Sequence, residues 1–276
     1  MNEEKQQELL ISVIITNYNY DQFIDQAIES VLSQTYYNFE LIIVDDGSTD
    51  NSRDVISSYT DSRIKALVKN NGGQASAFNA GFEQANGEII CFLDSDDWWK
   101  PEKLETIIRW HYFINKDYAI FQHVLDVWYE GKTRPYKHIL PSGDCFAEMK
   151  KVKKLDFFVP TSGLSFPKKI LDRIFPIPIK FIIAADSYIM RTACVFNMVY
   201  SIPKSLGFYR QHDNTVFLNP DFDLQPFLKE ILIPELNQFY QKYRINYQIE
   251  ISDYNFNERK KNKKQKIFEY LKKVFF

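Results

Sequence analysis

The first hundred residues alternate short apolar runs with segments whose apolar residues recur at helical spacing. The runs are rich in β-branched residues, which is typical of strands buried on both faces of a sheet. They are Ile11–Thr16, Leu41–Val44, Ile64–Val68 and Ile89–Leu93. Helices are expected after each run: one capped by Asp21, one from about 50 to 59, one carrying Ala75 to Ala85, and one with Pro101 in its first turn. Repeated strand–helix units predict a largely parallel α/β sheet, Rossmann-like and twisted, with helices on both faces.

Beyond residue 115 the pattern is less regular. We expect a strand at Ala119–Trp128, a loop or hairpin at Gly131–Gly143, a turn at Pro160–Gly163, a helix at Asp186–Val195, and a polar segment at Phe208–Thr215 after a short strand. The composition becomes lysine-rich near residue 250. The predicted organisation is therefore one domain over 1–250, with a first half at about 9–115, a second half at about 116–220 and a C-terminal helical extension, followed by a basic amphipathic tail over 251–276.

The composition of the 276 residues is that of an ordinary globular protein, with 45% hydrophobic and 25% charged residues. Three distant cysteines, Cys91, Cys145 and Cys194, fit neither a disulfide framework nor a zinc site and favour a reducing compartment. The acidic N-terminus lacks the apolar core of a secretion signal. No apolar run approaches the roughly 20 residues that span a bilayer. We expect a cytoplasmic protein, soluble or peripheral on the cytoplasmic face of the membrane.

The net charge of −2 conceals an asymmetry along the chain. Residues 257–276 carry eight Lys and Arg against two Glu, a charge of +6, which leaves −8 on the preceding 256 residues. An acidic body argues against nucleic-acid binding. The basic tail has apolar residues at helical intervals, so it could be an amphipathic helix on an anionic membrane or only a solvated end. Binding to anionic vesicles before and after deletion of 257–276 distinguishes the two.

Polar clusters follow three of the predicted strands: Thr16-Asn17-Tyr18, Asp45-Asp46 and Asp94-Ser95-Asp96-Asp97. In open α/β sheets, ligands bind in the crevice outside the carboxyl ends of the strands. Two carboxylates two residues apart suit Mg²⁺ or Mn²⁺, which share their coordination with substrate phosphates. Alone, the acidic cluster is equally compatible with a turn that caps the next helix, although repulsion among its carboxylates favours a cation.

Other features could serve the same edge, and each has an ordinary structural alternative. Asp45-Asp46 could accept a hydrogen bond from uracil or ribose, or cap a helix. The turn Asn70–Gln74 offers amides, or is only a tight turn. Asp186 could be a general base whose pKa is raised by partial burial, or a helix cap. His212 could contact phosphate or metal, although a single histidine is more often structural.

In this order along the chain, the residues resemble family 2 glycosyltransferases, which are inverting enzymes with the GT-A fold. The resemblance extends from about Ile11 to Leu104 and, more sparsely, to about Thr215. Its motifs are Val13-Ile14-Ile15-Thr16-Asn17-Tyr18-Asn19, Ser33-Gln34-Thr35-Tyr36, Glu40 to Asp50, Asn71-Gly72-Gly73-Gln74-Ala75, Asn79-Ala80-Gly81 and Phe92 to Asp97. As an ordered set they are far more specific than any single motif.

The resemblance implies a role for each matching position. The nucleotide-sugar would be bound by Thr16, Asn17, Tyr18, Asp46, Asn71, Gly73, Gln74, Asp94, Ser95 and Arg210. Asp96, with His212, would hold Mn²⁺ or Mg²⁺; Thr161, Ser162 and Gly163 would form the acceptor side; and Asp186 would be the catalytic base. Asp46 would bind the nucleobase, Asp94 would lie near the ribose and donor sugar, and Asp97 would only cap the next helix.

The expected reaction moves one sugar from a nucleotide-sugar, UDP-linked, to a hydroxyl of a glycan or lipid-linked saccharide. The Gln-x-x-Arg-Trp signature of processive synthases is absent, and Tyr209-Arg210-Gln211-His212 stands in its place. Ala185 precedes Asp186, where the family often has Glu or Gly. A nucleotidyltransferase would need glycine and a cation in the loop Asn17–Asp21, which has neither. The remaining alternative is a glycan-binding homologue without turnover, against which the retained carboxylates argue.

Overall fold

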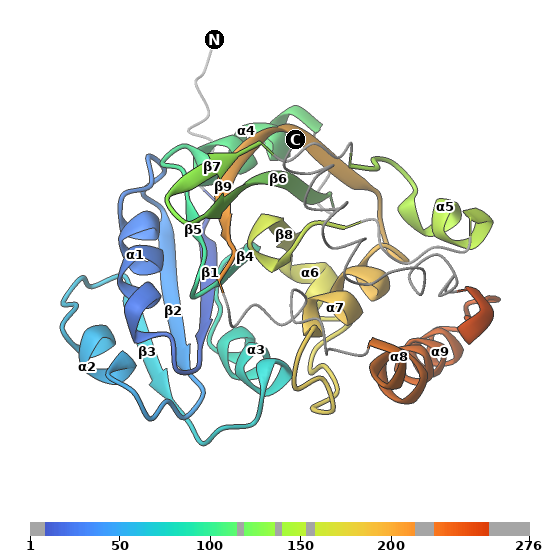
Figure 1. Ribbon diagram of the computed structural model, residues 1–276. Helices are drawn as coiled ribbons and strands as arrows, with labels where there is room; N and C mark the ends of the chain where they lie inside the picture. Colours follow the sequence, from blue (N-terminus) through green and yellow to red (C-terminus); the bar gives the residue numbers. More distant parts are fainter. Residues whose placement is uncertain (1–8, 115–118, 136–139, 153–157, 213–223, 254–276) are drawn as a thin grey trace, which may run out of the picture.

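Four parallel strands form the first half of the sheet in this computed structural model, which describes residues 9–114, 119–135, 140–152, 158–212 and 224–253 (Figure 1). They are β1 (Ile11–Asn17), β2 (Phe39–Asp45), β3 (Ile64–Val68) and β4 (Ile89–Asp94), in the order β3-β2-β1-β4. The register sets Asn17 beside Asp45, and Thr16 beside Asp94. The predicted parallel α/β sheet is confirmed, and its three polar clusters meet at one edge.

The second half of the sheet continues from β4 in mixed directions. Its strands are β5 (Trp98–Trp99), β6 (Ile120–Tyr129), β7 (Lys132–Arg134), β8 (Leu164–Pro167) and β9 (Val199–Arg210). The order is β4-β8-β6-β9-β5, and β7 pairs with β6. β5 follows β4 closely in the chain yet lies at the far end of this order, so the sheet curls back on itself. The curl brings the loop 95–97 against the end of β9.

The structure corrects two predicted features. Phe208–Arg210 are not a polar loop but the end of the long strand β9, because Trp98 and Phe208 pair across β5 and β9. The rest of that predicted segment, residues 213–215, lies outside the described residues. Asp21 does not cap α1, since Tyr20 occupies the N-cap position without a side-chain bond. The Asp21 carboxylate instead accepts the backbone N–H of Asn51 at 3.2 Å.

Helices cover both faces of the sheet. They are α1 (Asp21–Leu32), α2 (Ser52–Ser57), α3 (Gln74–Glu83), α4 (Lys103–Ile114), α5 (Cys145–Val152), α6 (Lys168–Leu171), α7 (Ala185–Ala193), α8 (Leu224–Pro226) and α9 (Ile233–Lys242). Successive strand residues point to opposite faces, so Val13 packs in the core with α1, α2 and α4, whereas Ile14 packs in the core with α3, α6, α7 and α9.

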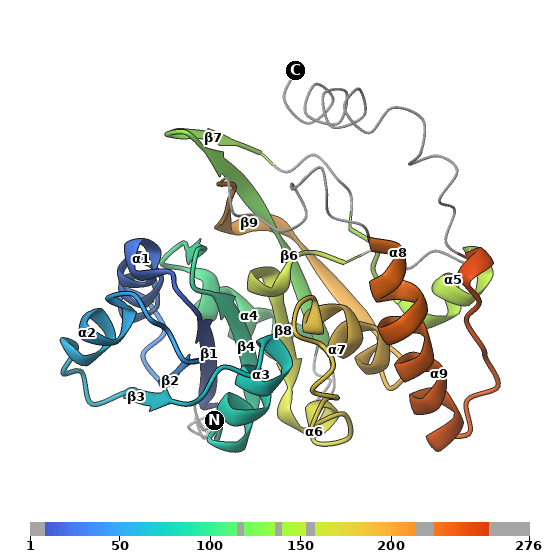
Figure 2. The same cartoon turned by 60° about the horizontal axis from the view of Figure 1, so that its bottom comes forward.

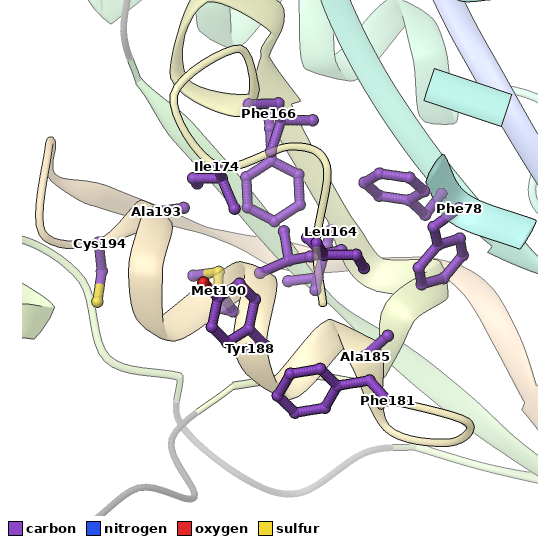
Figure 3. Close-up of a cluster of buried hydrophobic side chains, with 14 of the residues drawn as sticks. Phe78, Leu164, Phe166, Ile174, Phe181, Ala185, Tyr188, Met190, Ala193 and Cys194 are labelled. Atoms are coloured by element: carbon purple, nitrogen blue, oxygen red, sulfur yellow. The ribbon is translucent and has the colours of Figure 1, made fainter. Parts of the chain in front are cut away.

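The helix α7 is held by the larger of these cores. Figure 3 shows its packing around Leu164, Phe166 and Phe181. Tyr188 and Ile189 of α7 are almost fully buried. Because rigid apolar packing fixes the whole helix, the first turn of α7 has a defined position relative to β4 and α3.

The predicted C-terminal helical extension is present (Figure 2). A π-helical segment, Phe227–Leu232, joins α8 to α9, and a 3₁₀ turn follows at Ile251–Asp253. The basic tail beyond residue 253 lies outside the described residues, so the expectation of membrane contact stays a prediction. In the part of the chain that is described, no helix has both the length and the apolar character of a membrane span.

Candidate active site

The carboxylate of Asp45, at the end of β2, accepts hydrogen bonds from three neighbouring residues. Asp45 accepts bonds from Ser48 N at 2.9 Å, from Asn17 Nδ2 at 3.1 Å and from Arg53 Nε at 3.2 Å. Burial raises its pKa, but these bonds outweigh burial and hold the pKa below the ordinary value. Asn17 is therefore a support for the β2 turn, with its own amide oxygen buried and unbonded in the described structure.

The neighbouring carboxylate, Asp46, holds the turn before α3. It accepts the backbone N–H groups of Gly72 at 3.1 Å and Gly73 at 2.7 Å, and pairs with Lys69 at 2.5 Å. Gly47, with φ +84°, permits this approach, because a Cβ there would lie 2.6 Å from the backbone N of Asn71. The predicted nucleobase residue is thus bonded to the turn that was predicted to bind the nucleotide-sugar through Asn71, Gly73 and Gln74.

The acidic loop that ends β4 is anchored by Ser162, in the 3₁₀ turn Thr161–Gly163. Its hydroxyl accepts Asp94 N–H at 3.1 Å and lies 2.6 Å from the Asp97 carboxylate. The second oxygen of Asp97 accepts Arg210 N–H at 2.8 Å. Asp97 therefore does not cap the next helix as the sequence predicted: it is a buried link between the β4 loop, the acceptor-side turn and the end of β9.

Arg210 supports the same loop with its side chain. Its Nε donates to the carbonyl of Asp96 at 2.7 Å. The guanidinium lies 4.5–4.7 Å from the ring centres of Phe23, Trp98 and Trp128, within cation–π distance. Arg210 is 6% exposed, so its charge is enclosed by aromatic rings and fixes Asp96 rather than extending into solvent. The sequence analysis did not predict this cage of three aromatic rings around Arg210. The aromatic content of the chain, 16%, was its only indication in the sequence.

Asp96 and His212 form a hydrogen-bonded pair at the same edge of the sheet. His212 Nε2 lies 3.0 Å from Asp96 Oδ2, and its ring packs against Tyr20 and Phe23. Burial, followed by the charges of Asp96, Asp94 and Asp97, raises the pKa of Tyr20 to about 12. Tyr20 was also missed, although it adjoins the predicted donor loop.

The donors of this pair are of kinds that bind divalent cations: a carboxylate oxygen is a ligand that Mn²⁺ and Mg²⁺ prefer, and a neutral imidazole nitrogen also coordinates metals. The two atoms lie 3.0 Å apart, which is the distance of a hydrogen bond. Within the described residues no set of three or more His, Cys, Asp or Glu converges on one point. Asp96 and His212 are therefore the two candidate ligands in the described part of the site.

Asp186 lies in the first turn of α7, where it accepts Ser187 N–H at 2.8 Å. Thr161 is buried in the 3₁₀ turn beside Ser162, and its side chain lowers the pKa of both Asp186 and Asp94, although burial outweighs this influence. Burial raises the pKa of Asp186 above the ordinary value, in the direction expected for a general base. The carboxylates of Asp94 and Asp97 are also raised, first by burial and then by the charge of Asp96.

The structure thus gathers most of the predicted site residues at one edge of the sheet. Thr16 and Ser95 lie at the ends of β1 and β4, and Tyr18 and Asn71 are exposed beside them. Gly163 is packed against Val159, behind the Thr161–Ser162 turn. The arrangement brings the hydrogen-bonded pair Asp96–His212, the carboxylate of Asp94 and the half-buried Asp186 to the same edge.

Comparisons with known proteins agree with this geometry. The family model described as glycosyl transferase family 2 matches residues 12–175. An uncharacterised glycosyltransferase of Nostoc sp. is 40% identical over 211 residues, which cover 73% of this chain and 65% of that protein. A UDP-Glc:α-D-GlcNAc-diphosphoundecaprenol β-1,3-glucosyltransferase of Escherichia coli is 43% identical over 124 residues, 40% of this chain and 49% of that protein. The matched region therefore spans between half and two thirds of these relatives.

The fold also matches a solved structure. Residues 1–349 of Staphylococcus aureus TarS, in complex with UDP-GlcNAc, superpose with a TM-score of 0.66 at 18% identity, over 96% of this chain and 82% of that one. At this identity the likeness concerns the fold, which is the GT-A arrangement expected from the sequence.

Proposed function

This chain belongs to glycosyl transferase family 2, and we propose that it transfers one sugar from a UDP-sugar to an acceptor hydroxyl. A lipid-linked saccharide is the proposed acceptor, because the similar E. coli enzyme is named for a diphosphoundecaprenol substrate. The observation that carries the proposal is the position of Asp186, whose raised pKa suits a base: its helix α7 is hydrogen-bonded through Ala185 to Gln74, in the turn that Asp46 holds beside the strand ends.

In the proposed reaction the acceptor oxygen attacks the anomeric carbon of the donor. Asp186 takes the proton of that hydroxyl, and the bond from the anomeric carbon to the diphosphate oxygen breaks, with its electron pair leaving on the diphosphate. One displacement inverts the anomeric configuration, so an α-linked donor yields a β-linked product. Mn²⁺ or Mg²⁺ held by Asp96 and His212 would neutralise the charge of the leaving diphosphate.

The remaining residues serve binding and orientation. Thr16, Tyr18 and Asp46 are proposed to surround the nucleoside, and Asp94 the ribose or sugar. Arg210 keeps Asp96 in place through its carbonyl, and Thr161 is proposed to lie on the acceptor side of the site. The family match favours a glycosyltransferase over the nucleotidyltransferase and non-catalytic alternatives.

A thermal-shift screen with UDP-glucose, UDP-GlcNAc and GDP-mannose, each with and without Mn²⁺, tests the donor class. A ligand that binds the folded state raises the unfolding midpoint, so we expect a shift with a UDP-sugar that Mn²⁺ enlarges and that Asp96→Asn reduces. Asp172→Asn, at an exposed ion pair with Lys168, is the matched control. The absence of any nucleotide-sugar shift, or one equally large in Asp96→Asn, would count against the proposal.

A further inference from the structure

The turn before α3 is bonded to the loop that precedes α7. Gln74 N–H donates to the carbonyl of Ile182 at 2.9 Å, and Ala75 N–H donates to that of Phe181 at 3.0 Å. These are N–H groups of the first helical turn, which have no partner within the helix. Gly73 permits the approach, because a Cβ at that position would lie 2.7 Å from Ile182 Cα. A donor-side helix and an acceptor-side loop therefore share one junction.

The side chain of Gln74 extends this junction to the first residue of α7. Its Oε1 accepts the N–H of Ala185 at 2.8 Å, across 111 residues of sequence. Because Ala185 is the first residue of α7, the Gln74 bond sets the position from which Asp186 projects.

The backbone at this point is not relaxed. Ala184, immediately before α7, has φ +53° in the left-handed region, which is uncommon for a residue with a side chain. Such a conformation persists where surrounding contacts determine it. The hydrogen bond from Ala185 to Gln74 is one such contact, and Phe181 packs in the large core beside Ala185 (Figure 3).

The junction also reaches the nucleoside end of the site. Asp46 accepts the N–H groups of Gly72 and Gly73, the two residues before Gln74. A continuous series of hydrogen bonds thus runs from Asp46 through the 72–74 turn to the start of α7. Movement at the donor edge would be transmitted to Asp186 through this turn, since both ends are hydrogen-bonded to it.

We propose that Gln74 is a positioning residue that couples the donor-binding edge to the placement of the base Asp186, acting through the backbone of Ala185. The proposal rests on the function proposed above. It differs from a role as a direct donor ligand, because a positioning residue lowers turnover in the bound complex and leaves donor affinity nearly unchanged.

Gln74→Leu is the test variant, since leucine keeps much of the side-chain volume but cannot accept the N–H of Ala185. UDP binding with Mn²⁺, followed by calorimetry, should stay within about threefold of the wild type. The turnover of UDP-glucose hydrolysis, followed by UDP release, should fall about 10- to 100-fold, because misplacement of reacting groups by about an ångström has an effect of that size. Gln84→Leu, at the opposite end of α3, is the control and should change neither quantity.

A double-mutant cycle separates action through Asp186 from an independent effect. In an Asp186→Asn background, Gln74→Leu should lower the residual turnover less than twofold, because the residue it positions is gone. Equal losses in both backgrounds, unchanged turnover in the single variant, or tenfold weaker UDP binding with normal turnover would each overturn the proposal.

A second variant covers the case in which Gln74→Leu does not fold. Gln74→Asn carries the same amide on a side chain one methylene shorter, so its oxygen lies too far from the N–H of Ala185 to accept it. It should fold and keep UDP affinity within threefold while losing turnover. Normal turnover in this variant would contradict the coupling through Ala185. Failure of the proposed function has a separate signature: no UDP release by the wild type, or near-normal release by Asp186→Asn alone.

Discussion

The carboxylates that end β2 and those around the end of β4 lie at one edge of the sheet in opposite electrostatic surroundings. Asp45 and Asp46 are each paired with a basic side chain and accept several further hydrogen bonds. Asp94, Asp97 and Asp186 form no ion pair with Lys or Arg within the described residues, and burial raises the pKa of each. Both groups are acidic strand-end or helix-start residues, so residue type alone does not distinguish them.

The difference indicates which carboxylates support the site and which are available for chemistry. A carboxylate that already has hydrogen-bond donors and a basic side chain beside it gains little free energy from binding a ligand. A desolvated carboxylate without an ion-pair partner is stabilised by a proton or a metal cation. Groups with shifted pKa values therefore gather at functional sites. We therefore expect substitutions at the β4 side to affect activity most, and substitutions at the β2 side to affect stability most.

The largest expected effect is that of Asp186→Asn. Loss of a general base lowers turnover by about 10²- to 10⁴-fold, measured as UDP release from UDP-glucose with Mn²⁺. UDP affinity should be retained. Because the base acts when ionised and its folded-state pKa is raised, wild-type activity should fall with decreasing pH at a value above the ordinary aspartate pKa of about 3.9. The residual activity of the variant should lack that acidic limb.

The same variant also tests the electrostatic comparison through stability. A raised folded-state pKa means that the folded protein favours protonated Asp186, so ionised Asp186 destabilises the fold at neutral pH. Neutral asparagine removes this effect, and the unfolding midpoint at pH 7 should not decrease. A clear decrease in the unfolding midpoint at pH 7, with activity retained, would show that Asp186 does not belong with Asp94 and Asp97, the carboxylates whose pKa is raised.

Ser162→Ala should have an intermediate effect on both properties. It leaves Asp94 N–H and the Asp97 carboxylate without their shared partner, at a cost of about 1–3 kcal/mol in the free energy of unfolding. Turnover should fall about tenfold, because the loose loop carries Asp94 and Asp96. Ser165→Ala is the matched control: Ser165 is equally buried, on the adjoining strand β8, and contacts Cys91 and Lys103. It should alter stability alone. Equal activity losses in the two variants would refute a specific role for Ser162.

The first half of the chain, at about 9–115, was predictable because its strands and polar clusters are visible in the local sequence. The strands β1, β2 and β4 are buried on both faces, so apart from Ser12 and Glu40 near their beginnings they are apolar until the polar residues that mark where each strand ends. The register of parallel neighbours then requires those ends to meet. The fold class and the grouping of Thr16, Asp46 and Asp94 follow from these two facts.

The contacts of the second half of the chain, at about 116–220, join residues far apart in the sequence, which no local pattern predicts. Asp97 appeared to be a helix cap because its partners, Ser162 and Arg210, lie 65 and 113 residues further along the chain. The end of β9 appeared to be a polar loop because its partner strand, β5, is only two residues long and follows the acidic loop. Curling of the sheet produces both relationships, and curling is a property of the assembled strands.

The smallest expected effect on activity is that of Asp45→Asn, on the compensated side. Asparagine keeps the shape of the side chain but loses the charge that strengthens its bonds to Ser48, Asn17 and Arg53, so unfolding should become easier by about 1–2 kcal/mol at pH 7. Turnover should change less than threefold. The folded-state pKa of Asp45 is lowered, so its contribution is present above the unfolded value of about 3.9 and is lost as the pH falls through the folded value. The stability difference between wild type and variant, measured by urea unfolding, should therefore shrink below about pH 4.

Asp61→Asn, which breaks a partly exposed pair with Arg63, serves as the control and should change stability by less than about 1 kcal/mol. A large loss of turnover with unchanged stability in Asp45→Asn would show that the β2 carboxylates take part in the reaction directly, and the contrast between the two sides of the edge would no longer hold.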